Sequence, residues 1–165
     1  MSNKRVAFIC IVSFWTVMLG NQAVHADGYF EKLKRDSDTA CTEVKSALKS
    51  FSSKLKLSEG PGSVELQTHL GINKRNGCKV SLSGPYVSDV QPETDLSQHF
   101  VAEKWTALLI YDADGPTGGQ YSFFKNDALC IVRYDTDGGG LGGPEPTKYD
   151  LEVTCVGGYL VTIVE

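Results

Sequence analysis

The sequence has few of the residues on which catalytic and nucleic-acid-binding sites usually depend. Only 3 of its 165 residues are histidine, and 16 Lys and Arg stand against 20 Asp and Glu, for a net charge of −4. A chain of this charge without a basic cluster is poorly suited to phosphate backbones, which argues against nucleic-acid binding. It also offers no basic amphipathic face to an anionic membrane. The acidity favours a protein that stays in solution and complements a basic partner.

Recognisable catalytic motifs are missing as well. The chain has no Cys-x-x-Cys pair, no Gly-x-Ser-x-Gly elbow and no phosphate-binding Walker loop. An acid–base pair can be assembled from His69 or His99 with a carboxylate such as Glu65 or Glu103. Nothing in the spacing requires these residues to meet. The missing motifs weigh against an enzyme and leave a small secreted hydrolase as the alternative.

The first 26 residues are typical of a secretory signal peptide. Lys4 and Arg5 supply the positive end, an apolar stretch follows over residues 6–19, and small residues precede a cleavage site after Ala26. The apolar stretch is shorter than the ~20 residues of a membrane-spanning helix, which disfavours a retained anchor. We expect cleavage after Ala26, a secreted or periplasmic location with no membrane attachment, and a single mature domain over residues 27–165.

Four cysteines follow the predicted cleavage site. An even number in an exported domain predicts disulfide bonds, here two bonds with three possible pairings. Cys41 lies on the apolar stripe of a predicted helix, and Cys78 lies on the inward side of a predicted strand. Cys130 and Cys155 lie on consecutive predicted strands, which are neighbours in an antiparallel sheet. We therefore expect the pairs Cys41–Cys78 and Cys130–Cys155.

The first structural element of the predicted domain is an amphipathic helix. Residues 27–57 have apolar or small residues at steps of three and four, which places them on one helical face. Gly60, Pro61 and Gly62 follow and predict the end of the helix and a hinge.

A hairpin and a connection follow. The alternation of apolar and polar residues predicts a hairpin over residues 63–83, with its turn at residues 73–77 because Asn-Gly is a strong hairpin signal. Residues 84–98 carry two prolines and predict an exposed connection. We expect one helical turn from Thr94 to His99, capped by Thr94 or Asp95.

The stretch from residue 104 to residue 156 contains four apolar runs separated by three turn signals. Short runs rich in Val, Ile, Leu, Tyr and Phe between Gly, Asn and Asp clusters are typical of antiparallel hairpins. We therefore predict a C-terminal four-stranded meander. The fold class that follows is α+β, with an N-terminal amphipathic helix packed on an antiparallel sheet that contains the meander and two disulfides.

Two of the turns in the meander nearly repeat each other. Both read Tyr-Asp-x-Asp-Gly, with Asp112 and Asp114 in the first and Asp135 and Asp137 in the second. Alternate turns of a meander lie at the same end of the sheet, so four carboxylates are expected to approach one another. Calcium, which accepts carboxylate and carbonyl oxygens from flexible loops, would offset their repulsion. Plain turn chemistry is the favoured interpretation, because Asp side chains bond nearby backbone N–H groups.

The loops themselves are candidates for protein recognition. Residues 117–121 resemble the Ser-Gly-x-x-Tyr loop of small periplasmic lysozyme inhibitors of bacteria, with Thr in place of Ser. Those inhibitors have a barrel-like architecture without a long N-terminal helix, so the likeness is confined to the loop. The predicted binding residues are Thr117, Gly118, Tyr121, Gly139 and Leu141.

Small size, disulfides, acidity and Gly-rich loops together predict an exported, non-enzymatic binding protein. An inhibitor or an immunity-type partner of another secreted protein fits this description. Besides the hydrolase, a second alternative is a subunit of an envelope or surface assembly that is recruited through the sheet edge. The sequence leaves the partner and the oligomeric state open.

Overall fold

The structure, a computed structural model, describes residues 7–68, 71–139 and 143–158 of the chain. The chain divides into two compact units, Met1–Lys32 and Leu33–Glu165, and the boundary falls inside the first helix. The described part of the first unit is helical, and the second unit holds the sheet. Over the described residues, no helix has the length and hydropathy that a membrane crossing requires.

Helix α1 (Ala7–Leu48) continues into a short 3-10 helix, η1 (Lys49–Ser53). The prediction of an α-helix up to residue 57 is therefore wrong at its end. Serine hydroxyls compete for backbone carbonyls near this point, and the hydroxyl of Ser52 donates to the carbonyl oxygen of Lys49 at 2.8 Å. The tighter helix then ends, and the chain enters a strand at Lys56.

Strands β1 (Lys56–Thr68) and β2 (Gly71–Pro85) form a hairpin longer than the predicted one. The predicted hinge at residues 60–62 lies inside β1, which tolerates Pro61 because β1 is the edge strand of the sheet. The predicted turn at residues 73–77 is also wrong, since these residues lie inside β2. A Cβ on Gly77 would lie 2.0 Å from the carbonyl oxygen of Cys155, so close strand packing explains this glycine.

The connection contains a full helix, α2 (Pro92–Ala102), in place of the single predicted turn. It begins at Pro92, with Gln91 as the N-cap residue, so the predicted cap at Thr94 or Asp95 is wrong. A proline in the first helical turn lacks only an N–H group that would have no partner there, which explains why the helix starts at this point.

The predicted meander is confirmed, with its first strand broken into pieces. Strand β3 (Thr106–Ala107), the 3-10 helix η2 (Leu109–Tyr111) and strand β4 (Ala113–Asp114) run along one edge of β5 (Gly118–Lys125). Strands β6 (Ala128–Thr136) and β7 (Lys148–Gly157) complete it. Asn126, with a φ of 58°, makes the tight turn between β5 and β6.

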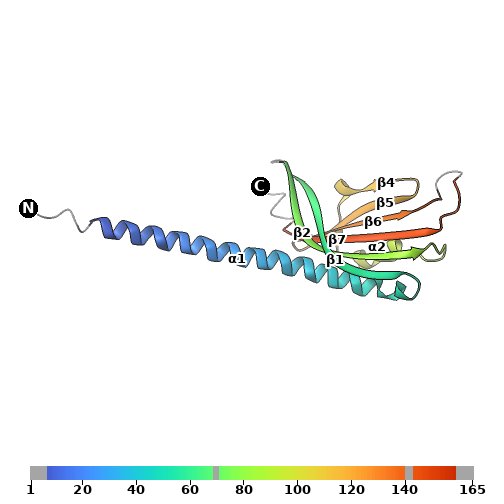
Figure 1. Cartoon of the computed structure of the whole chain (residues 1–165), viewed down its shortest axis with the longest axis horizontal. Coiled ribbons are helices and arrows are strands. Elements are labelled where there is room, and N and C mark those ends of the chain that lie inside the picture. The colour runs from blue at the N-terminus through green and yellow to red at the C-terminus, as the bar shows by residue number, and fades with distance from the viewer. Residues whose placement is uncertain (1–6, 69–70, 140–142, 159–165) are drawn as a thin grey trace, which may run out of the picture. The chain divides into compact units, whose positions relative to one another are not determined.

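The strands among the described residues belong to one antiparallel seven-stranded sheet in the order β1-β2-β7-β6-β5-β3, with β4 also paired to β5 (Figure 1). The hairpin of β1 and β2 is strongly curved in this view. Because β2 lies beside β7, the N-terminal hairpin and the C-terminal meander share one sheet. The predicted α+β class, with the helix packed on the sheet, is confirmed.

The main core lies on the sheet face that α1 and α2 cover, which we call the helix face. Val44 and Leu48 of α1 and Leu96 and Phe100 of α2 pack there against alternate residues of the strands. Both predicted disulfides are confirmed, with Cα–Cα distances of 6.3 Å for Cys41–Cys78 and 4.1 Å for Cys130–Cys155. Two disulfides are compatible with an oxidising, extracellular compartment.

The opposite side of the sheet, which we call the second face, has a smaller core at one end of the strands. Buried residues of β6 and β7 pack there against residues of the curved strand β1. Leu108, Tyr111 and Phe124 pack around this cluster. Its buried members, which we call the apolar end, are Val64, Leu66, Leu129, Ile131 and Val156.

Candidate functional site

The two Asp-containing loops lie side by side, as alternate turns of a meander should. Gly118 pairs with Asp135 across β5 and β6, and the amide N–H of Thr136 donates to the carbonyl oxygen of Thr117 at 2.8 Å. The hydroxyl of Thr117 donates to Oδ1 of Asp135 at 3.1 Å. The sequence therefore places the two loops correctly relative to each other.

Two of the carboxylates in these loops accept hydrogen bonds from backbone amides. Asp112 accepts a bond from the amide of Ser122 at 3.3 Å, and Asp135 accepts one from the amide of Thr136 at 2.9 Å. Asp114 is exposed in the short strand β4. Among the residues that the structure describes, no group of three or more His, Cys, Asp or Glu could hold a metal ion. The Asp135 bond, from the amide of the next residue, is turn chemistry of the kind that the sequence favours, whereas the Asp112 bond reaches across to β5. The calcium site stays a prediction.

Asp137 fixes the base of the Gly-rich loop between β6 and β7. Its Oδ1 accepts bonds from the amides of Thr147 at 2.7 Å and Lys148 at 2.8 Å, and its Oδ2 accepts one from the Thr147 hydroxyl. These bonds stabilise the ionised form and lower the pKa of Asp137 to about 2, with the Thr147 hydroxyl as the main cause. Asp137 therefore closes the loop that Gly138 begins.

Of the predicted binding residues, Tyr121 and Gly118 belong to strand β5 and support the fold. The Tyr121 hydroxyl donates to the carbonyl oxygen of Glu93 at 2.5 Å and so ties β5 to α2. Burial, with the Glu93 charge as a second cause, raises the pKa of Tyr121. A Cβ on Gly118 would lie 2.2 Å from the carbonyl oxygen of Tyr134, so this position needs glycine for strand pairing.

The remaining predicted binding residues belong to the loops. Thr117 is partly buried at the base of the first loop. Gly139 is exposed with a φ of +89°, and its amide donates to the carbonyl oxygen of Pro144 at 2.8 Å. Leu141 lies outside the described residues. Among the described members of this group, Gly139 is thus the exposed one.

His99 lies on α2 beside Glu43 of α1, whereas His69 lies outside the described residues. The distance from Nε2 of His99 to Oε1 of Glu43 is 3.7 Å, and this nitrogen is buried without a hydrogen bond. The same Oε1 accepts a bond from the Trp105 indole N–H at 2.8 Å, and Oε2 lies 3.6 Å from Nζ of Lys125. The carboxylate that approaches His99 is therefore Glu43, which the sequence did not indicate.

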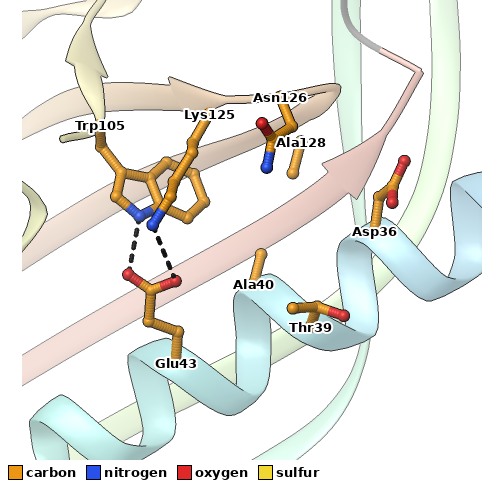
Figure 2. A pocket seen from close by; sticks show the side chains of 8 residues that line it. All are labelled: Asp36, Thr39, Ala40, Glu43, Trp105, Lys125, Asn126 and Ala128. Atoms are coloured by element: carbon orange, nitrogen blue, oxygen red, sulfur yellow. Dashed lines mark hydrogen bonds and ion pairs between the residues drawn. The ribbon is translucent and has the colours of Figure 1, made fainter. Parts of the chain in front are cut away.

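A small pocket of about 150 Å³ opens beside this cluster (Figure 2). Figure 2 shows Glu43 reaching up from α1 toward both the Trp105 indole and the Lys125 amine, and Nζ of Lys125 lies 5.7 Å from the Trp105 ring centre. Three segments that are far apart in sequence thus meet at one carboxylate. We interpret the cluster as a clamp that holds α1 on the sheet, and the sequence could not reveal it because no motif links the three residues.

A larger hollow of about 460 Å³ lies over β2, β7 and β6. The side chains that open into it alternate with core residues of the helix face, so they lie on the second face, beyond the apolar end. They form cross-strand rows, with Ser81 beside Glu152 and Glu152 beside Arg133, and with Ser83 beside Asp150 and Asp150 beside Asp135. We call this group the polar end. Its members are Ser81, Ser83, Arg133, Asp135, Asp150 and Glu152.

The charges of the polar end are partly offset by neighbours. Glu152 lies 3.1 Å from Nζ of Lys79, and Asp150 lies 2.5 Å from Nζ of Lys148. Nε of Arg133 donates to the side-chain oxygen of Gln120 at 2.5 Å. The hydrogen bond and attraction of Asp150 raise the pKa of Lys148. The three carboxylates of the polar end thus stand against three cations, Arg133, Lys79 and Lys148, and the surface is of mixed charge.

Sequence reasoning found one member of the polar end, Asp135, and missed the other five. A signal was present, because polar residues at every second position of three strands alternate with core residues of the helix face. What the sequence could not reveal is that β2 and β7 are neighbours, which brings these polar positions together.

Comparisons of this chain with protein-family models, with curated proteins and with solved structures gave no match. No relative therefore supplies a function for this chain. The geometry of the polar end, the loops beside it and the Glu43 cluster are the features from which a function has to be inferred.

Proposed function

We propose that this chain is a small exported, non-enzymatic binding protein that engages a partner protein through the polar end. The observation that carries the proposal is the hollow of about 460 Å³, which three neighbouring strands line with polar side chains while both helices pack on the other side. An open, rigid sheet face next to exposed loops suits recognition of another protein. An inhibitor or immunity-type partner of another secreted protein would use such a surface.

The chemistry of the polar end favours a basic segment of the partner. Asp135 and Asp150 face each other directly across β6 and β7, and like charges in that position destabilise a sheet. Lys148 already offsets part of this repulsion, and a Lys or Arg side chain of the partner would relieve the rest. The net charge of −4 for the whole chain becomes more negative if the predicted signal with Lys4 and Arg5 is removed, which would steer a basic partner toward this protein.

The two alternatives have less support. A hydrolase acting through His99 needs a free carboxylate, and Glu43 is already bonded to Trp105 and close to Lys125. An assembly subunit recruited through the sheet edge would use β1, where Pro61 lacks the N–H group that a pairing strand requires. Export itself rests on the signal-like residues 1–26 and on the two disulfides.

The proposal can be tested by photo-crosslinking in the producing cells and in their medium. A photoreactive benzophenone side chain at Ser81 probes the polar end, and the same group at the exposed Ser50 of η1 is the matched control. We expect one dominant protein adduct from Ser81 and none from Ser50, and the His99→Ala variant should give the same adduct. No adduct at Ser81, or equal adducts at both sites, would contradict the proposal. A hydrolytic activity that disappears in His99→Ala would favour the first alternative.

A further inference from the structure

The two disulfides differ in their exposure to solvent. Both sulfur-bearing residues of the Cys130–Cys155 bond are fully buried, at 0 % exposure each. In the other bond, Cys41 is 8 % exposed and Cys78 is partly exposed. A thiol in solution can therefore approach Cys78 without unfolding, whereas it can reach Cys130 and Cys155 only after the core opens.

A hollow of about 320 Å³ leads to the exposed bond. It lies between α1 and the β1–β2 hairpin, and Asp38 and Thr42 of α1 and Glu59 of β1 contribute to its walls together with both cysteines. This volume exceeds the roughly 30 Å³ that one water molecule occupies in the liquid, and it has room for a small thiol.

The charges around this hollow do not exclude a thiolate. Nζ of Lys34 lies 2.5 Å from the Asp38 carboxylate, and Nζ of Lys45 lies 2.9 Å from the Glu59 carboxylate. Each acidic wall residue thus has a basic partner, which offsets its repulsion of an approaching anion.

We propose that Cys41–Cys78 is an exchangeable disulfide that reacts with external dithiols in the folded protein, while Cys130–Cys155 stays oxidised. A thiolate of the dithiol attacks Sγ of Cys78, so a mixed disulfide forms as the bond to Cys41 breaks. Sγ of Cys41 leaves as a thiolate and takes a proton from solvent. The second thiol of the dithiol, as its thiolate, then attacks the sulfur of the same dithiol that is bonded to Cys78. The bond to Cys78 breaks, and Cys78 is released as a thiolate. Two electrons pass to the protein, and the dithiol leaves as a disulfide.

Reduction loosens one part of α1 and leaves the rest in place. Val44 and Leu48, which follow Cys41 in the chain, are fully buried. The hydrogen bond between Glu43 and Trp105 holds the same segment. Before Cys41, the backbone of Leu33 lies so close to Gly157 that a Cβ there would come within 2.3 Å of the Leu33 carbonyl oxygen. Ser37 and Ala40 are buried as well, at 2 % and 3 % exposure. After loss of the disulfide, residues 33–40 depend on these noncovalent contacts alone, so we expect this segment to open more often while the core persists.

The test is reduction of the oxidised full chain with dithiothreitol under native conditions, followed by acid quench, alkylation and peptide mass mapping. We expect alkylation of Cys41 and Cys78 at least about tenfold faster than of Cys130 and Cys155, because only the buried pair requires an opening of the fold. In denaturant the difference should vanish. Equal rates in the native protein, or faster loss of Cys130–Cys155, would overturn the proposal.

Two variants of α1 test the route of access. Thr42 lines the hollow, whereas Thr39 lines the Glu43 pocket on the other flank of the helix, and both side chains are exposed. Thr42→Phe should slow reduction of Cys41–Cys78 by about threefold or more through blocked access, and Thr39→Phe should leave the rate unchanged. Equal rates in the two variants would overturn the assigned route. In the reduced protein, amide hydrogen exchange should rise at residues 33–40 and stay low at residues 44–48.

Discussion

The two ends of the second sheet face are made by the same strands and differ completely in character. Along β6, Leu129 and Ile131 are buried, and Arg133 and Asp135, which point to the same side, are exposed. Along β7, the change runs from Val156, which is fully buried, to Asp150, which is only partly buried. The second face therefore has a small core at one end and an open polar surface at the other.

The curved hairpin accounts for this difference. Val64 and Leu66 of β1 pack over the apolar end, so Leu129 and its neighbours are withdrawn from water there. Beyond that contact, the strands line an open hollow of about 460 Å³, and polar residues occupy the surface. Cover by β1 therefore divides the second face into a stabilising apolar end and an open polar end.

The largest expected effect is a loss of stability at the apolar end. Leu129→Ala should lower the free energy of unfolding by about 2–5 kcal/mol, because it leaves a cavity in the small core. Arg133 lies four residues further along β6, on the same side of the strand. Arg133→Ala should change the free energy of unfolding by less than about 0.5 kcal/mol. Urea unfolding of both variants measures the difference. Similar losses in the two variants would mean that the polar end also contributes to the core.

The second expected effect concerns the closeness of β2 and β7 at the apolar end. Gly77→Ala should cost about 1–3 kcal/mol, because the added Cβ collides with the Cys155 carbonyl and the strands must shift. Gly60→Ala in β1 is the matched control, since a Cβ there meets nothing within 4 Å. Thermal unfolding should show a lower Tm for Gly77→Ala alone. A tolerated Gly77→Ala would contradict the strand register described here.

Much of the fold could be predicted from local patterns. Periodicity located the helix, alternation located the meander, and the two cysteine pairs follow from the faces on which Cys41 and Cys78 lie and from the adjacent strands of Cys130 and Cys155. Two of the errors, the hinge at residues 60–62 and the turn at residues 73–77, arose because a glycine or proline reflects its place in the sheet and not a local turn. Gly77 allows close strand packing, and Pro61 lies on an edge strand, although both resemble turn signals.

The candidate site was harder to predict because it depends on long-range pairing. Asp135 and Asp150 are separated by a loop, and Ser83 reaches them only because β2 pairs with β7. Glu43, Trp105 and Lys125 are likewise brought together by packing of α1 on the sheet. Alternation indicates that a strand has a polar side, but it does not indicate which strands are neighbours.

A smaller effect is expected at the polar end itself. Asp135→Asn should raise the free energy of unfolding by about 0.2–1 kcal/mol, because it removes the repulsion from Asp150 while the amide oxygen can still accept a hydrogen bond. The gain should shrink at high salt, which screens exposed charges. Chemical unfolding at low and high salt measures both. A loss of stability would mean that the Asp135 charge is compensated in the free protein.

The smallest expected effect is a local one at Asp137, and it depends on pH. The folded pKa of Asp137 is about 2, below the ordinary 3.8, so its contribution to the loop is present above pH 3.8 and is lost as the pH falls through about 2. Amide protection of Thr147 and Lys148 should fall over that interval, while protection of Ile131 at the apolar end should persist. Hydrogen exchange measured by NMR resolves these sites. Simultaneous loss at all three sites would indicate global unfolding.

The most direct test of the central claim is the affinity for the protein captured through Ser81, measured with two charge-reversed double variants. Asp150→Lys with Glu152→Lys changes the polar end, and Glu65→Lys with Asp89→Lys makes the same change in net charge at exposed positions elsewhere. Both proteins are first checked for folding by thermal unfolding. We predict that Kd rises at least about tenfold for the polar-end variant, because a basic segment then meets like charge, and changes little for the control. Equal weakening of both variants, or unchanged binding by the polar-end variant, would contradict the account.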